Sequence, residues 1–225
     1  QHALRLGGEY RRLFKGLSIA APDTGTYTFT SIASFIADQP FRQTLTVNPN
    51  TGERTNFPRY FVQHETAFFI QDDWKVSSKL NLSIFSSTSF MDARYKKASI
   101  RNGNDNVNLS GNKVESVPEW ISRNGLTLKY NKWSVSALAS YTSSSFADAI
   151  NTVNPSLNAA SGLVPSYFLL DVNLSFYLNE FLKFQLNCNN LLDKNYFTKR
   201  PQFYPGPGIW PSDDRTFSGT LSIKI

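Results

Sequence analysis

Apolar and polar residues alternate with a period of two along much of this chain, whereas a helical period of 3.6 is weak throughout. In the clearest example, the apolar positions are Val172, Leu174, Phe176 and Leu178. The same alternation recurs in three other segments, 133–141, 182–189 and 217–225. Because successive side chains of a strand point to opposite faces, these segments are predicted to be strands with one apolar and one polar face.

Eight segments follow this pattern over lengths that are unusual for a strand. They cover residues 2–14, 58–76, 79–96, 119–130, 133–146, 165–178, 181–192 and 215–225. Strands of soluble sheets cluster near about 5–6 residues, and most of these segments are longer. A tilted strand of about 9–11 residues crosses a bilayer core. The lengths therefore favour a sheet that spans a membrane.

The connections between these segments are alternately short and long. Tight polar turns are predicted at Ser77-Ser78, Asn131-Lys132 and Asn179-Glu180, and the long connections are 15–57, 97–118, 147–164 and 193–214. Short turns at one end and long loops at the other are typical of outer-membrane barrels. The predicted fold class is therefore all-β, an antiparallel transmembrane β-barrel of eight long up-and-down strands, which is either part of a larger barrel or shortened from one.

Aromatic residues and small polar residues support the same interpretation. Trp74, Tyr130, Trp133, Tyr177 and Phe181 lie beside the short turns, and Tyr95, Trp120, Tyr141, Phe146, Tyr167 and Tyr196 lie near the long loops. Two aromatic bands are expected where rings lie at the headgroup level of a bilayer. The polar positions are mostly Ser, Asn and Gln, as on a wall that faces a wet lumen. A soluble β-protein with the same rings in its core and edges is the alternative.

Composition excludes several classes of protein. The 225 residues are 40% hydrophobic, 14% aromatic and 18% charged, which is too apolar for a disordered chain. No run of about 18 apolar residues predicts a membrane helix, and a single cysteine, Cys188, excludes a disulfide framework. The net charge is +6, but the basic residues are scattered, so no nucleic-acid partner is expected.

Catalytic and metal-binding patterns are missing from the sequence. The only histidines, His2 and His64, do not form a His-Glu-x-x-His motif. Asp72 and Asp73 are adjacent, so they point to opposite faces of a strand and do not form a carboxylate pair. The segment 102–106 has one carboxylate, too few for tight calcium binding. We therefore expect no enzyme activity, no catalytic or metal-ligating residue and no cofactor.

One segment resembles a known family signature. Asn190-Leu191-Leu192-Asp193-Lys194-Asn195-Tyr196 is similar to the Asn-Leu-x-Asp-x-x-Tyr motif that ends the penultimate strand of TonB-dependent outer-membrane receptors. The run 196–213 resembles the last extracellular loop of the ferric-citrate-type receptors, and segments 88–95, 111–120 and 143–149 fit the same group over about residues 85–225. Within the signature, Asn190, Asp193 and Tyr196 are expected to be structural, ending a strand and anchoring an aromatic band.

The first 80 residues resemble another subgroup of the same family. Segments 25–29, 37–40 and 69–76 are similar to Oar-like receptors. Both resemblances imply one architecture, so residues 1–225 are expected to form a single receptor-like barrel domain with an internal junction near 80–85. Family members close 22 strands around an N-terminal plug, and neither a plug nor a TonB-contact segment is recognised here. The chain alone is therefore not expected to perform energised transport.

The resemblance implies a receptor or transporter for a ferric chelate, such as a siderophore or ferric citrate, in the cell outer membrane. The implied partners are outer-membrane lipid and lipopolysaccharide, the barrel-assembly machinery, and the TonB complex through a plug segment. An alternative is a small self-contained barrel with a structural or partner-binding role. Eight strands is the smallest size of bacterial membrane barrels, so a closed barrel and an open arc of a larger wall are both compatible with the sequence.

Candidate ligand-binding residues follow from the charge of such a ligand. A guanidinium makes two parallel charge-assisted bonds to a carboxylate, and an ammonium binds it as a point charge. The basic residues on the predicted outer loops are Arg101, Lys199 and Arg200, with Tyr204 and Trp210 as rigid aromatic walls. The competing interpretation is that these basic side chains contact lipopolysaccharide phosphates or are simply solvated.

Overall fold

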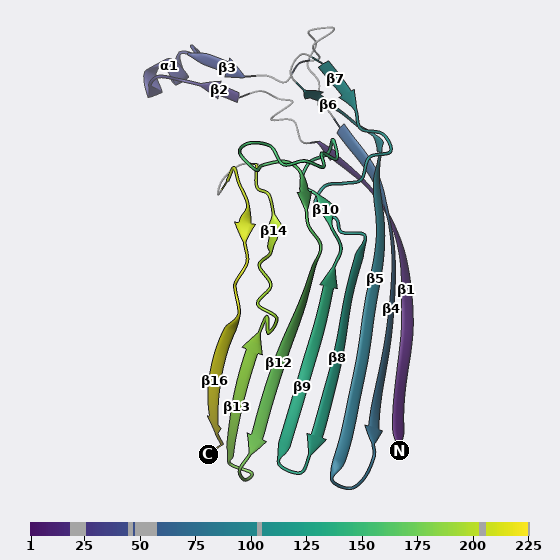
Figure 1. Cartoon of the computed structure of the whole chain (residues 1–225). Coiled ribbons are helices and arrows are strands. Elements are labelled where there is room, and N and C mark those ends of the chain that lie inside the picture. Colours follow the sequence, from purple (N-terminus) through teal and green to yellow (C-terminus); the bar gives the residue numbers. More distant parts are fainter. Residues whose placement is uncertain (19–25, 45–46, 48–57, 103–104, 203–205, 225) are drawn as a thin grey trace. The chain divides into compact units, whose positions relative to one another are not determined.

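The main feature of the protein is one eight-stranded sheet (Figure 1). The computed structural model describes residues 1–18, 26–44, 47, 58–102, 105–202 and 206–224. The order of the strands in the sheet is β1-β4-β5-β8-β9-β12-β13-β16, so each long strand lies beside the next one in sequence. Their bounds are β1 His2–Ser18, β4 Pro58–Lys75, β5 Leu80–Lys97, β8 Trp120–Tyr130, β9 Trp133–Thr142, β12 Tyr167–Tyr177, β13 Leu182–Asn189 and β16 Thr216–Ile223.

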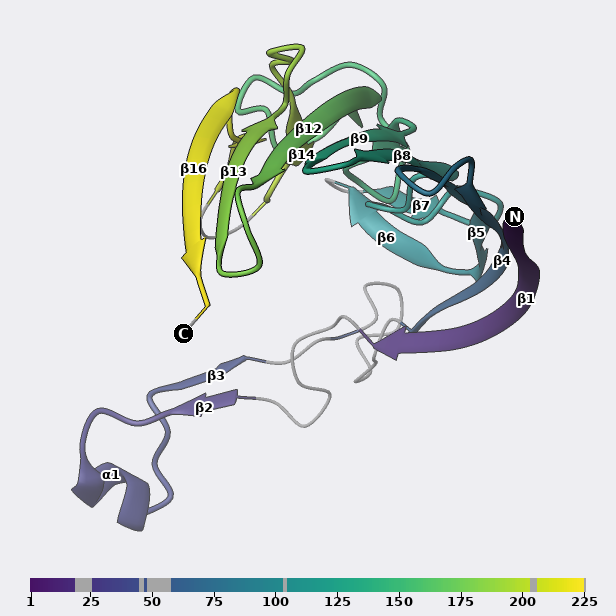
Figure 2. The ribbon, with the colours of Figure 1, turned by 90° about the horizontal axis from the view of Figure 1, so that it is seen from below.

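The chain divides into two compact units. Unit 1 comprises Gln1–Leu13, Gln63–Ala93 and Lys113–Ile225, and unit 2 comprises Phe14–Val62 and Arg94–Asn112. In unit 1 the long strands follow an arc, with β1 and β16 at its two ends (Figure 2). The sheet is therefore open between β1 and β16, and the eight strands do not close on themselves. The prediction of eight long up-and-down strands is confirmed.

The short turns lie where the sequence predicted them, at one end of unit 1. Asn179 accepts hydrogen bonds through Oδ1 from the backbone N–H groups of Phe181 (2.9 Å) and Leu182 (2.8 Å). Ser77 accepts in the same way, through Oγ, from Lys79 (3.2 Å) and Leu80 (3.1 Å). Asn131 adopts a positive φ of 50°, which Asn tolerates better than most residues. Local side-chain chemistry thus determines these three turns.

The register of the strands separates a polar face from an apolar face. One row across five strands is polar throughout: Thr127, Ser136, Asn173, Asn187 and Ser218. Members of this row hydrogen-bond to one another, with Thr127 Oγ1 and Ser136 Oγ 2.9 Å apart and Asn187 Nδ2 donating to Ser218 Oγ at 3.2 Å. The next row, on the opposite face, is Leu128, Val135, Leu174, Leu186 and Gly219. The predicted alternation is confirmed.

The exposure of the two faces is the reverse of that in a water-soluble protein. On the polar face Ser175 is 3% exposed and Ser134 is 7% exposed, whereas on the apolar face Leu186 is 62% and Phe217 is 74% exposed. Exposed apolar patches of this extent indicate contact with a non-aqueous environment or with a partner. The continuous backbone pairing within the sheet meets the other requirement of hydrocarbon, which is that backbone polar groups be paired.

The aromatic bands differ in part from the prediction. At the short turns Trp133 packs against Phe176 with ring centroids 4.5 Å apart. Register places Tyr167 and Tyr177, however, on the polar face, because Asn173 of the same strand is polar and successive side chains alternate. Tyr95, predicted to lie in the outer band, is only 3% exposed. Phe90 and Phe168 are exposed near the long loops instead, because alternation, rather than nearness to a loop, decides which face a ring occupies.

Three long strands are shorter than predicted at the loop end or the chain end. The segment 133–146 pairs as β9 only to Thr142, 181–192 only to Asn189, and 215–225 only from Thr216 to Ile223. Asn190 has a φ of 50°, which ends the extended conformation of β13. Just after β9, the N–H group of Ser143 still donates to the carbonyl of Trp120 (2.9 Å), but the N–H group of Trp120 donates to Ser143 Oγ (3.0 Å), so a side chain replaces the backbone acceptor of the ladder.

The long connections contain small elements that the periodicity did not reveal. Four are two-stranded sheets: β2 (Thr26–Thr28) with β3 (Arg42–Thr44), β6 (Ser99–Asn102) with β7 (Asp105–Asn108), β10 (Ser145–Phe146) with β11 (Leu163–Val164), and β14 (Phe197–Lys199) with β15 (Trp210–Pro211). The helix α1 (Ile32–Ile36) begins at a capping box between Ser31 and Ser34. Runs of two to five residues are too short for a period to be recognised.

Unit 2 has a small core of its own. Leu109 is fully buried, and its N–H group donates to the carbonyl of Ala98 at 2.9 Å. Tyr95 bonds through its backbone to Asn112 (3.0 Å) and Gly111 (2.8 Å). These contacts bring the chain back from β7 to the end of β5.

Among the residues that the structure describes, no helix has the length and apolar character needed to cross a membrane.

Candidate functional site at the loop end of the sheet

The candidate site lies in unit 1, at the end of the strands opposite the short turns. Its segments are 113–119, 143–166 and the described parts of 190–215, which are 190–202 and 206–215. Two of them carry the small hairpins β10–β11 and β14–β15. Function is expected at such loops, because the strands position them while the loops themselves tolerate changes of sequence.

The structure brings three of the five predicted ligand-binding residues together. Lys199 and Trp210 are register partners in the β14–β15 pair, and both are exposed. Arg200 directly follows Lys199. Arg101 lies in β6 of unit 2, and Tyr204 lies outside the described residues. Ligand contact by these five residues stays a prediction.

The guanidinium of Arg200 already has partners within the protein. Its Nε donates to the carbonyl of Leu163 and its NH1 donates to the carbonyl of Ala159, both at 3.0 Å. Its Cζ also lies 4.7 Å from the ring centroid of Phe197, within the range of a cation–π interaction. Arg200 therefore ties the β14–β15 hairpin to the end of the loop 147–164. The exposed pair Lys199 and Trp210 is freer to meet a ligand.

Asp148 organises the loop between β10 and β11. Its Oδ1 accepts from the N–H groups of Ile150 (3.1 Å) and Thr152 (3.2 Å) and from the hydroxyl of Thr152 (3.0 Å). Its Oδ2 accepts from the N–H group of Gly162 at 3.2 Å. Asp148 is 8% exposed. Charge-assisted bonds to a carboxylate are stronger than neutral ones, so this one residue holds both ends of the loop.

Asn151 joins this loop to the segment that follows unit 2. The N–H group of Lys113 donates to Asn151 Oδ1, and Asn151 Nδ2 donates to the carbonyl of Lys113, both at 2.8 Å. Ser116 adds a backbone bond to the carbonyl of Phe146 at 2.8 Å. The side-chain amide of Asn151 therefore makes the same two hydrogen bonds to the backbone of Lys113 that a residue of a neighbouring strand would make. The three segments of the site form one connected assembly.

The three signature residues make contacts around the turn that ends β13, and the structural role that the resemblance implies for them stays a prediction. Asn190, 4% exposed, accepts from the N–H group of Lys194 at 2.9 Å and donates to its carbonyl at 3.0 Å. Asp193 Oδ2 accepts from Arg215 NH2 at 3.0 Å. Tyr196 packs against Tyr167 with ring centroids 4.8 Å apart. These contacts join the turn at the end of β13 to Arg215 and to Tyr167.

Sequence reasoning missed Asp148 and Asn151 as organising residues. The bond from Ile150 to Asp148 spans two residues and is of the Asx-turn type, which a local pattern can indicate. Asn151 and Lys113 are 38 residues apart, and no local pattern pairs them. Within the described ranges, no group of three or more His, Cys, Asp or Glu residues is arranged to hold a metal ion.

A hollow of about 200 Å³ opens on the polar face of the sheet. It is lined by uncharged polar residues such as Thr127, Asn173 and Asn187, by apolar residues such as Phe85 and Leu138, and by the carboxylate of Asp171. Amides and hydroxyls exchange hydrogen bonds with water or with a passing polar group. The hollow therefore offers amide and hydroxyl groups beside apolar side chains, with a single carboxylate.

Two family models match the chain. The model described as outer membrane beta barrel domain matches residues 1–133, and the model described as TonB dependent receptor-like, beta-barrel matches residues 79–191. Each match covers at least half of the chain, and together they include all eight long strands except β16. The family resemblance derived from the sequence is therefore confirmed.

A relative and several solved structures agree with this assignment. The chain is 30% identical over 135 residues to the probable TonB-dependent siderophore receptor PiuA of Acinetobacter baumannii, a match that covers 58% of this chain and 16% of that protein. The crystal structure of that organism's siderophore receptor PiuA matches with a TM-score of 0.56 and 21% identity, over 80% of this chain and 24% of that one.

Two other solved structures share the fold at low identity. The ferric citrate transporter FecA in its unliganded form matches with a TM-score of 0.55 and 18% identity, over 77% of this chain and 32% of that one. The ferripyoverdine receptor of Pseudomonas aeruginosa matches with a TM-score of 0.53 and 14% identity, over 98% of this chain and 25% of that one. This chain belongs to the TonB-dependent receptor family of outer-membrane β-barrels, and its location is the outer membrane.

Proposed function

We propose that the protein is a receptor that takes up a ferric chelate, such as a ferric siderophore or ferric citrate, and that this chain provides part of its barrel wall and outer loops. The family supports uptake, and the relative PiuA is named as a probable siderophore receptor. The chain spans 16% of the length of that relative, so the activity of the whole protein is part of the proposal.

The loop geometry supports an anionic ligand. Lys199 and Trp210 are register partners in the β14–β15 pair and are exposed, so the same hairpin presents an ammonium and an aromatic ring to a ligand. The loops beneath this pair are held by Arg200, Asp148 and Asn151. Loops that are already held in place reduce the ordering that ligand binding requires.

The partners of such a receptor belong to the same proposal. We expect the barrel-assembly machinery to insert the wall, lipopolysaccharide and other lipids to surround it, and the TonB complex to act through a plug segment. No nucleic acid and no resident cofactor take part, since iron would be cargo.

The test is a titration of the full-length, detergent-solubilised protein with ferric citrate and with ferric siderophores, followed by quenching of tryptophan fluorescence. We expect saturable quenching. Lys199→Gln should weaken binding about tenfold, the order of one charge-assisted hydrogen bond. Lys132→Gln, which removes the same charge at a short turn, is the matched control and should leave the affinity unchanged.

Absence of saturable binding to every iron chelate tested would contradict the proposal. The alternative, a self-contained eight-stranded barrel, requires β1 to pair with β16. These strands are the two ends of the sheet order, so the open sheet favours the receptor.

A further inference from the structure

The apolar face of the sheet carries a group of polar side chains where β5 pairs with β8. Ser86 Oγ donates to Asn124 Oδ1 at 2.7 Å, and Asn124 Nδ2 donates to Ser122 Oγ at 3.1 Å. Thr88 Oγ1 and Ser122 Oγ lie 2.8 Å apart. Ser122 and Asn124 are an even number of positions from Leu128, and Thr88 and Ser86 are their register partners, so all four residues share the apolar face with Leu128. We call these four residues the polar cluster.

The polar cluster lies between the two aromatic ends of β8. Trp120 and Tyr130 are both exposed on the same face and are ten residues apart, or about 34 Å along the strand at about 3.4 Å per residue. At a strand tilt of about 40° this corresponds to a height of about 26 Å, close to the apolar band of an outer-membrane barrel, which is about 25 Å tall. Asn124, four residues from Trp120 and six from Tyr130, therefore lies well inside this band.

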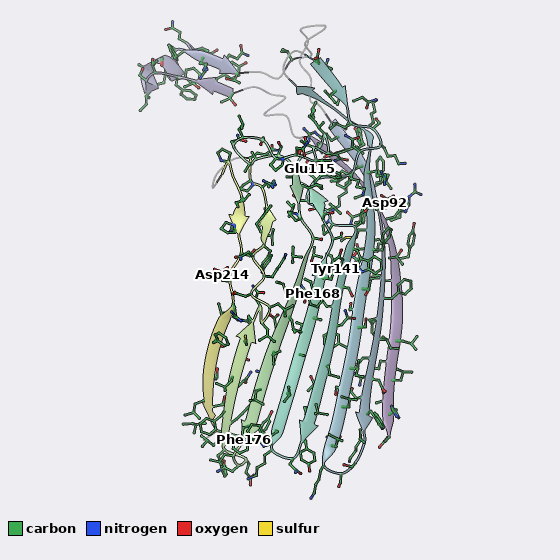
Figure 3. All side chains as sticks on the ribbon, in the orientation of Figure 1. Asp92, Glu115, Tyr141, Phe168, Phe176 and Asp214 are labelled. Carbon is green, nitrogen blue, oxygen red and sulfur yellow. The ribbon has the colours of Figure 1, made fainter. Side chains whose placement is uncertain are left out.

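The neighbouring strands place Asn124 at the same depth. Tyr141 and Phe168 lie toward the loop end of the wall, and Phe176 lies at the opposite end (Figure 3). Ser122 is the register partner of Tyr141, and Asn124 pairs with Ala139, two positions further from the loops. Alanine has only a methyl group as its side chain, and Asn124 is exposed. The amide is therefore accessible from outside the wall.

The amide of Asn124 has hydrogen-bonding capacity that the polar cluster does not use. An asparagine amide carries two N–H donors and two acceptor lone pairs. Among the contacts of the described residues, Asn124 uses one N–H toward Ser122 and one lone pair for Ser86. In an outer-membrane barrel the apolar face of the wall meets lipid, and hydrocarbon offers neither a donor nor an acceptor. A polar side chain at this depth indicates a contact with another protein.

We propose that the polar cluster is the contact surface for a second copy of this protein in the outer membrane. A two-fold axis along the membrane normal brings residues of equal depth together, so Asn124 meets the partner subunit's Asn124. The remaining N–H of each amide then donates to the remaining lone pair of the other. None of the four residues carries a charge, so two copies of the surface do not repel each other. Their small side chains and Ala139 allow two walls to approach closely, as small residues do at protein contacts within membranes.

Other occupants fit the polar cluster less well. An acyl chain would leave the donor and the acceptor of Asn124 unpaired. An unrelated membrane protein would need both groups at the same depth, whereas a second copy always presents them. The contact depends on the location of the wall in the membrane and not on the cargo, so it stands or falls separately from the proposed uptake of a ferric chelate.

The first experiment measures energy transfer between fluorescently labelled copies of the full-length protein in phosphatidylcholine vesicles as the protein is diluted with lipid. We expect a dimer that dissociates on dilution. Asn124→Leu should weaken association about tenfold, the order of two hydrogen bonds between membrane-embedded side chains. Asn189→Leu, which removes an exposed amide from the polar face, is the matched control and should associate as the wild type does.

Cross-linking gives a second readout that does not depend on the leucine variant. In a Cys188→Ser background, Asn124→Cys should give a disulfide-linked homodimer on oxidation with copper phenanthroline, because position 124 meets itself across the axis. Leu186→Cys, exposed on the same face in β13, should not cross-link.

Three results would overturn the proposal. The first is a wild-type monomer at every protein-to-lipid ratio, and the second is unchanged association of Asn124→Leu, which would limit Asn124 to bonds within its own wall. The third is equal cross-linking at positions 124 and 186, or cross-linking of position 124 in native membranes to a different protein alone.

Discussion

The strand wall and the loop assembly of unit 1 are ordered by different interactions. In the wall, backbone ladders join neighbouring strands, and the middle rows of each face keep one chemical character across several strands. In the loops, single side chains bond to distant backbone groups, as Asp148 does to Gly162, Asn151 to Lys113 and Arg200 to Leu163.

This difference has a consequence for substitutions. Many equivalent contacts stabilise the wall, so the effect of a change there should depend on the face it occupies. The loop assembly depends on a few polar side chains, so the effect of a change there should depend on which residue is altered. The four predictions below test this comparison, beginning with the largest expected effect.

Val172→Arg is expected to cost about 2–4 kcal/mol of unfolding free energy, the cost of a guanidinium on the lipid side at mid-membrane depth. Val172 lies on the apolar face, midway between Phe168 and Phe176 in β12. Urea unfolding in lipid vesicles measures the effect. Leu138→Arg on the polar face is the control, because its register partner is Asp171, and it should cost far less. Equal costs would contradict the assignment of the two faces.

Asp148→Ala is expected to destabilise the loop 147–164 by about 2–3 kcal/mol, because several donors lose a charged acceptor. Hydrogen exchange at the amides of Ile150, Thr152 and Gly162 should become faster, while exchange in the wall stays unchanged. Asp148→Asn keeps an acceptor oxygen and should show a smaller effect. Faster exchange throughout the strands would show that wall and loops are not separately ordered.

Gly125→Ala is expected to cost about 1–3 kcal/mol through overpacking. A Cβ at this position would lie 1.9 Å from Cε1 of Phe85, whose ring covers the glycine. Adding Phe85→Ala should recover part of the loss. Gly219→Ala is the matched control, since its nearest neighbour would be Leu186 Cδ2 at an ordinary 3.7 Å. Equal costs for the two glycine changes, measured by urea unfolding, would contradict this account.

Arg200→Lys is expected to have the smallest effect: it should lower the free energy of local opening of the loop assembly by about 1 kcal/mol. A lysine ammonium cannot donate to the carbonyls of Leu163 and Ala159 at the same time with the geometry of the planar guanidinium. Limited proteolysis should cut the segment 193–214 several-fold faster than in the wild type. Lys199→Ala, one residue away and exposed, should leave the cutting rate unchanged. If both variants are cut equally fast, Arg200 does not hold this loop.

The fold was predictable from local patterns because alternation in a strand is a local property. The polar row through Ser136 and Asn173 and the turn at Asn179 were both visible in the sequence, and the structure places them as expected. The aromatic bands were predicted less well, since Tyr167 and Tyr177 share the polar face with Asn173. That prediction rested on how close each ring is to a loop, whereas the register of the strands decides which face of the sheet a ring occupies.

The sequence could indicate which residues to consider for the candidate site, but not the hydrogen bonds that join its loops. Lys199, Arg200 and Trp210 were identified by charge and aromatic character, and the structure brings them into one hairpin and its flank. The sequence assigned Arg200 the same role as Lys199. The carbonyls that hold the Arg200 guanidinium come from residues 159 and 163, about 40 positions earlier, and no spacing rule links them.

The amino-acid sequence by itself determined the long amphipathic strands, the short turns and the membership of an outer-membrane family, because each depends on neighbours within a few residues. Tertiary structure alone decided that the sheet stays open between β1 and β16, that Asn151 joins two loops, and that Arg200 reaches the carbonyls of Ala159 and Leu163. These contacts join residues far apart along the chain, so they exist only once the ladder register has placed the strands.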